Sequence, residues 1–116
     1  MQVVRIFTRS DQQSHFEDIE LKFSGDPTLL TTEPQAAKTI VFRSAPPGTV
    51  LDWHPAPRRQ YVITISGGWD IVCGDGTTRR FRPGDVMLAD DLTGQGHIAR
   101  VVGNDPHIFI TVPLAD

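Results

Sequence analysis

The chain has 116 residues, 39% of them hydrophobic, and a formal net charge of −3, which fits one compact domain. Its Arg and Lys residues form no basic block and its apolar runs are strand-sized, so neither nucleic acid nor a membrane is an expected partner. Cys73 is the only cysteine and no leader-like segment precedes the first apolar run, so we expect a soluble cytoplasmic protein without an internal disulfide.

Short β-branched and aromatic runs fill the chain from end to end. Ten Gly and nine Pro separate them, which is typical of an all-β sandwich or barrel. The predicted strands, in chain order, are Val3–Thr8, Phe16–Phe23, Thr39–Ser44, Val50–Trp53, Gln60–Ile65, Trp69–Cys73, Thr77–Phe81, Val86–Ala89, His97–Val102 and His107–Val112.

The connections between these runs carry turn chemistry. Residues 66–68 and 74–76 are rich in Gly and predict hairpin turns, because such turns need positive φ. Residues 46–48 and 82–85 contain Pro-Gly and predict fixed turns that end a strand. Residues 24–38 predict a loop that crosses one end of the barrel and can serve as a lid.

One spacing of polar residues stands out in the middle of the chain. Gly48 is followed by His54, Gln60 and Gly67, with five, five and six residues in the three intervals. This spacing resembles the first motif of the cupins, in which a second His stands two residues after the first; here Ala56 takes that place.

A second motif resembles the remainder of the cupin pattern. Residues 83–85 read Pro-Gly-Asp, and residues 94–97 read Gly-Gln-Gly-His, so that His97 matches the last ligand position. The resemblance implies a double-stranded β-helix, or jelly-roll, barrel formed by a single domain of residues 1–116. Its motif-bearing core would be about 39–102, with N-terminal strands in 1–23 and the loop in about 24–38. Residues 14–18 and 53–61 also resemble a subgroup of small one-domain cupins.

The resemblance implies a metal site made of His54, Gln60 and His97. Imidazole suits iron, zinc, nickel and other transition metals, and manganese is a further candidate. An amide is a weaker ligand than a carboxylate, and Ala56 removes one imidazole, so the expected affinity is below that of a complete site. The alternative is that both histidines and Gln60 are only hydrogen-bonded polar residues of the interior.

Strand parity adds Asp52 as a secondary candidate ligand. Residues two apart on a strand share a face, so Asp52 should face the same side as His54. A turn or surface role is the alternative for Asp52. By the same rule Tyr61 should face away from Gln60, although a slip of one residue would exchange the two.

Several other residues allow both a functional and a structural interpretation. Arg58 and Arg59 are able to bind a carboxylate, but solvated or ion-paired arginines are the more common case. Trp53 and Trp69 are expected in the core or an interface. The remaining candidates carry no functional prediction: His15, His107 and Cys73, the last read as a buried, inert thiol.

Two functional hypotheses follow from these residues. In the first, the barrel binds a divalent transition metal and a small organic ligand, and any enzyme activity would be that of a dioxygenase or isomerase acting on a small organic acid. In the second, the pocket binds or senses a small molecule without metal or turnover. In both, edge strands and leftover apolar faces predict a homodimer.

Overall fold

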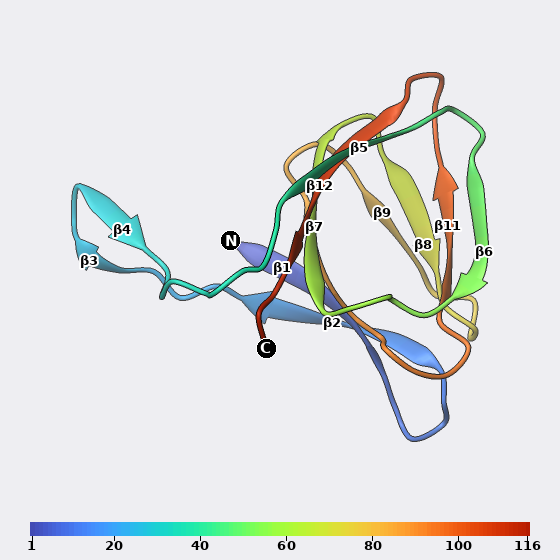
Figure 1. Ribbon diagram of the computed structural model, residues 1–116, viewed down its shortest axis with the longest axis horizontal. Helices are drawn as coiled ribbons and strands as arrows, with labels where there is room; N and C mark the ends of the chain where they lie inside the picture. Colours follow the sequence, from blue (N-terminus) through green and yellow to red (C-terminus); the bar gives the residue numbers. More distant parts are fainter.

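The computed structural model describes residues 1–116 and consists of twelve strands without a helix (Figure 1). No segment therefore forms the long apolar helix that would cross a membrane. The strands are β1 (Gln2–Thr8), β2 (Ser14–Glu20), β3 (Ser24–Asp26), β4 (Leu29–Thr31), β5 (Val41–Ala45), β6 (Val50–His54), β7 (Gln60–Ser66), β8 (Trp69–Val72), β9 (Thr78–Phe81), β10 (Val86–Asp90), β11 (His97–Val101) and β12 (His107–Pro113).

Two sheets make the barrel. Six strands form the larger sheet in the order β2-β1-β10-β7-β12-β5, and four form the smaller one in the order β6-β11-β8-β9. Only the β1–β10 pair is parallel within them. The turn at residues 46–49 joins β5 to β6, which are edge strands of different sheets, so the barrel is open on this side (Figure 1).

The core lies between the two sheets. Strand β12 alternates strictly between buried and half-buried positions. Its buried residues therefore point toward the smaller sheet. Eleven buried residues make up the main cluster, which includes Ile6, Ile71, Phe81 and Phe109. A smaller cluster of Val3, Leu88 and Leu114 covers the opposite face of the larger sheet. The expectation of an all-β jelly-roll barrel is confirmed.

All ten predicted strands exist, with ends within three residues of the prediction. The region expected to be a loop differs, because it holds the β3–β4 hairpin. Asp26 starts its turn by accepting hydrogen bonds from the backbone and side chain of Thr28. This hairpin projects away from the barrel instead of crossing one of its ends (Figure 1).

Candidate functional site

A pocket of about 290 Å³ opens between the two sheets. This volume suits a small molecule. Its walls include Met87, Trp69 and Phe109, which make the inner part apolar. Six polar side chains also line it: Arg43, His54, Arg58, Gln60, His97 and Thr111. The pocket thus contains all three residues predicted as metal ligands, and no carboxylate lines it.

A β-bulge in β6 aims His54 into the pocket. His97 pairs with His54 and Ala99 pairs with Leu51, so β6 has two residues in the interval where β11 has one. Leu51 and His54 therefore both line the pocket although they are three residues apart. The bulge breaks the parity on which the Asp52 prediction depended. Asp52 is exposed and does not line the pocket, so its side chain is not part of this site.

Glycine at position 96 permits the close approach of the two histidines. Gly96 has φ of 75°, and a Cβ atom there would lie 2.0 Å from the carbonyl oxygen of His54. Only glycine avoids both the left-handed strain and this collision. As a result, His97 follows directly at the start of β11, and its ring centroid is 4.6 Å from that of His54.

A buried carboxylate holds His97. Asp91 is fully buried, and its Oδ2 atom lies 2.6 Å from Nδ1 of His97 and accepts a 2.6 Å hydrogen bond from the Ser14 hydroxyl. The backbone carbonyl of Asp91 also accepts a hydrogen bond from Ala56 N. Asp91 therefore positions both His97 and the loop between β6 and β7.

In both pocket imidazoles the same nitrogen, Nδ1, is engaged by an oxygen of the protein. His54 places Nδ1 2.6 Å from the carbonyl oxygen of Asp52, and a carbonyl can only accept a hydrogen bond. The Asp91 carboxylate makes the same demand on Nδ1 of His97. In each neutral ring Nε2 is then the nitrogen with a free lone pair. Such engagement of the second nitrogen by a carbonyl or carboxylate is characteristic of metal-binding histidines.

Gln60 completes the polar group at this end of the barrel. It is the first residue of β7 and lines the pocket, whereas Tyr61 packs against the small cluster on the other face of the sheet. The predicted parity of these two residues is therefore confirmed. Ala56 is buried in the pocket wall at the position where the motif has its second His.

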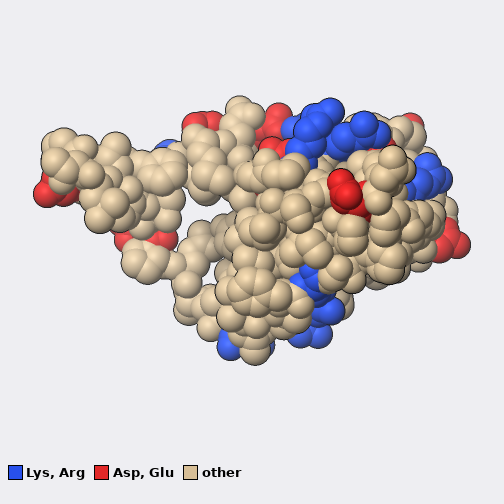
Figure 2. All heavy atoms as spheres, turned by 90° about the horizontal axis from the view of Figure 1, so that it is seen from above, with Lys and Arg blue, Asp and Glu red and all other residues tan.

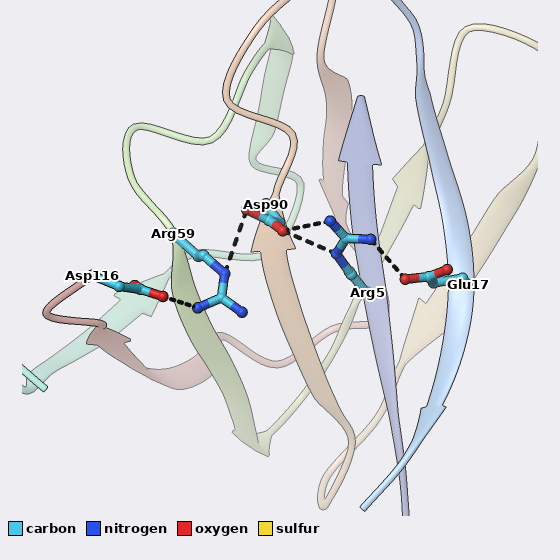
Figure 3. Close-up of polar contacts among 5 residues, drawn as sticks. All are labelled: Arg5, Glu17, Arg59, Asp90 and Asp116. Atoms are coloured by element: carbon cyan, nitrogen blue, oxygen red, sulfur yellow. Dashed lines mark hydrogen bonds and ion pairs between the residues drawn. The ribbon is translucent and has the colours of Figure 1, made fainter. Parts of the chain in front are cut away.

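The adjacent arginines have different surroundings. Arg59 forms ion pairs with Asp90 and with Asp116, and Asp90 is also bound by Arg5 at 2.8 Å (Figure 3). Because its partners are carboxylates of the protein, Arg59 fits the structural interpretation. Arg58 is exposed, lines the pocket and has no ion-pair partner.

The inner end of the pocket rests on a buried aromatic group. Trp69, His107 and Phe109 lie with ring centroids 4.5 to 4.8 Å apart. Burial lowers the pKa of His107 to about 4, so this imidazole is neutral near pH 7. Trp69 is a core residue as expected, whereas Trp53 is 39% exposed.

Two other residues keep the structural roles expected of them. Burial raises the pKa of the Cys73 thiol to about 12, helped by the charges of Asp75 and Asp91, so the thiol is inert. His15 lies near the surface with its Nε2 atom 2.7 Å from Asp11. Neither of these side chains lines the pocket.

The donor set fits a divalent transition metal with open coordination positions. His54 and His97 supply two imidazoles and Gln60 one amide oxygen, which is the number of protein ligands in many catalytic sites. No group of three or more His, Cys, Asp or Glu side chains is placed so that it could hold a metal ion, so the set depends on the weak amide. The residues therefore suit a site of modest affinity.

Comparison with solved structures finds the same fold in several proteins. One is an uncharacterised conserved protein with a double-stranded β-helix domain from Klebsiella pneumoniae, with 29% identity over 65% of this chain and 64% of that one and a TM-score of 0.52. Another is a conserved protein of unknown function from Streptococcus pyogenes, with 21% identity over 66% and 64% and a TM-score of 0.51. The cupin domain of Schizosaccharomyces pombe Cnp3 has 15% identity over 87% and 72%, with a TM-score of 0.51.

These similarities establish the fold of the chain, which is the double-stranded β-helix. No protein-family model matches the sequence, and no curated protein matches it either. The present chain aligns with less than two thirds of the length of the Klebsiella and Streptococcus proteins. These similar structures therefore define the fold, and the residues of the pocket indicate which ligand this protein binds.

Sequence reasoning missed three residues of the site. Asp91 and Arg43 stand in no motif, and Arg43 reaches the pocket from β5. Ser14 begins the segment 14–18 that resembles the small cupins, and this was the one signal available for it. The structure brings Ser14 and Asp91 together through the pairing of β1 with both β2 and β10.

Proposed function

We propose that the pocket binds a divalent transition metal through His54, His97 and Gln60, together with a small organic acid. The observation that carries the proposal is the shared arrangement of the two histidines. Each has Nδ1 engaged by a fixed acceptor, so each offers Nε2 to the same pocket. A bound ion would supply a Lewis acid with open positions for a ligand or for oxygen.

The pocket's own residues favour an anionic ligand. Arg43 and Arg58 line it without a carboxylate partner, and a guanidinium binds a carboxylate through two parallel hydrogen bonds. Trp69, Met87 and Phe109 form an apolar wall that would hold a short carbon chain and exclude water. If the protein is an enzyme, a dioxygenase or isomerase reaction on an organic acid fits these residues.

The test is metal content in protein purified without added metal or an affinity tag. We expect the wild type to contain, or to bind when it is added, stoichiometric iron, nickel, zinc or manganese, and His54→Ala and His97→Ala to lose this binding. His15→Ala is the matched control, because His15 is held by Asp11 and lies outside the pocket. A wild-type protein that is metal-free and also fails to bind added ions would refute the metal site.

The alternative function is a metal-free module that binds a small organic ligand without turnover. Ala56 favours it, because this buried residue leaves the pocket one imidazole short of the cupin motif. In that case small carboxylic acids would raise the melting temperature of metal-free protein, whereas the corresponding amides would not. Arg58→Gln should then reduce the shift, since it removes the guanidinium at the pocket.

A further inference from the structure

The β3–β4 hairpin forms an arm, defined here as residues 22–35. No hydrogen bond or ion pair joins these residues to the rest of the chain, and all six strand residues are exposed. A hollow of about 300 Å³ lies where residues 32–35 approach the outer face of the larger sheet. A two-stranded hairpin is only marginally stable alone in water, so the arm needs a surface to pack on.

Exposed apolar side chains occur both on the arm and around the mouth of the pocket. On the arm, Leu29 is 71% and Leu30 51% exposed, and Phe23 is exposed beside them. On β5 and β6, Phe42 is 71% exposed and Trp53 is also open to solvent. The remaining apolar residues on this side of the barrel are Ile40, Val41, Val50 and Leu51. Exposed apolar residues gathered on two edge strands in this way are characteristic of an interaction surface.

The mouth also has two free strand edges. β5 pairs only with β12, and β6 pairs only with β11, so each strand leaves one row of backbone groups unpaired. Arg43 on β5 and Leu51 on β6 line the pocket itself. An extended segment docked on these edges would therefore lie across the entrance.

The arm and the mouth of the pocket differ in the charge of their side chains. The arm carries Asp26 and Glu33 and, after Lys22 at its root, no cation. At the mouth, Arg43 and Arg58 line the pocket and have no ion-pair partner. The two edge strands β5 and β6 carry one acidic residue, Asp52. Figure 2 shows acidic side chains on the projecting arm and both basic and acidic ones on the barrel. The arm has two acidic residues against Lys22, and the mouth has two arginines against Asp52, so the two surfaces carry small net charges of opposite sign.

We propose that the arm of a second copy of this chain packs along β5 and β6 and covers the mouth of the pocket. The arm of each copy projects away from its own mouth (Figure 1), so a two-fold exchange covers both mouths at once. Leu29 and Leu30 of the incoming arm would complete the apolar rim. The proposal extends the proposed function, since it makes the entrance of the ligand pocket part of a dimer interface.

Cross-linking between two different single-cysteine variants tests the exchange directly. Cys73 is buried with a raised pKa, so introduced surface cysteines alone should react. Leu30→Cys is mixed with a Phe42→Cys chain that carries a mass tag, and a short thiol cross-linker is added. We expect a product containing one chain of each kind. Leu92→Cys, at a comparably exposed leucine in the loop after β10, replaces Leu30→Cys as the control. Equal products from both mixtures, or none from either, would overturn the proposal.

Sedimentation of the full chain provides an independent readout. We expect a dimer for the wild type and for Leu92→Asp, and a rise of about tenfold or more in the dimer dissociation constant for Leu30→Asp and for Phe42→Asp. Circular dichroism checks that each variant retains its strands. A monomeric wild type that binds metal would overturn the arm exchange alone, whereas a metal-free dimer that meets these expectations would overturn the metal site alone.

Discussion

The two histidines of the pocket belong to regions that differ in burial and in how they fix a side chain. His97 starts β11, which is buried at four of its five positions, and it is held by the buried carboxylate of Asp91. His54 ends β6, an edge strand with four exposed positions, and is held by a backbone carbonyl. One ligand therefore depends on a buried side-chain network, and the other depends only on the local shape of the chain.

This difference predicts a large loss of stability on replacing Asp91 and almost none on replacing Asp52, although both residues accept a hydrogen bond from a pocket histidine. Asp91→Ala should lower the free energy of unfolding by about 3–5 kcal/mol, because it leaves Ser14 and His97 without their buried partner. It should also weaken metal binding. Asp52→Ala should change the stability by less than about 0.5 kcal/mol and leave metal binding intact, because only its carbonyl is used. Urea denaturation and metal titration measure both variants, and similar losses in the two would contradict the comparison.

A side chain at Gly96 would disrupt the close packing of the β11 start against the end of β6. Gly96→Ala should destabilise the protein by roughly 3 kcal/mol, since left-handed strain adds to a Cβ placed 2.0 Å from the His54 carbonyl oxygen. Gly103→Ala is the matched control, with φ of 80° and no atom near the added Cβ, and should cost only about 1 kcal/mol. Thermal and urea unfolding of the pair separate strain from collision. Equal losses would mean that the close approach to His54 is unimportant.

The buried region should also respond to acid through His107. Its pKa is about 4 in the folded protein and about 6.5 when unfolded, so the unfolded chain binds the proton first as the pH falls. The stabilisation is fully present above pH 6.5 and is lost progressively toward pH 4, by up to about 3 kcal/mol. Unfolding measured across this range should show a steeper loss for wild type than for His107→Gln. Parallel curves would exclude His107 as the source.

The smallest expected effect concerns the missing imidazole. Ala56→His restores the motif at a position that lines the pocket beside His54. We expect metal affinity to rise roughly 10–100-fold, the scale of change seen when contacts around a metal are altered. Isothermal titration with zinc or nickel measures it, with Ala56→Gln as a control of similar size. An unchanged affinity would indicate that His54 and His97 do not hold a metal.

Much of the fold could be predicted because it depends on local chemistry. Alternating apolar residues and turns rich in Gly and Pro predicted ten strands. The spacing of Gly48, His54, Gln60 and Gly67 indicated one side of the site through its resemblance to the cupin motif. The β3–β4 hairpin was missed because its strands are three residues long and have no apolar alternation. Asp52 was expected on the face of His54 because parity assumes a regular strand, and the bulge in β6 is visible only when β11 is paired with it.

The sequence by itself determined the fold class and the outward position of Tyr61, because both follow from periodicity. The resemblance of its motifs to those of the cupins indicated three of the six polar residues of the pocket, His54, Gln60 and His97. Only the tertiary structure decided that Asp91, hydrogen-bonded by Ser14, holds His97. It also decided that Arg43 rather than Arg59 reaches the pocket, and that the arm leaves the barrel. The physical reason is that these contacts join strands far apart in the chain. Their partners are selected by sheet pairing and burial, which no local pattern of residues contains.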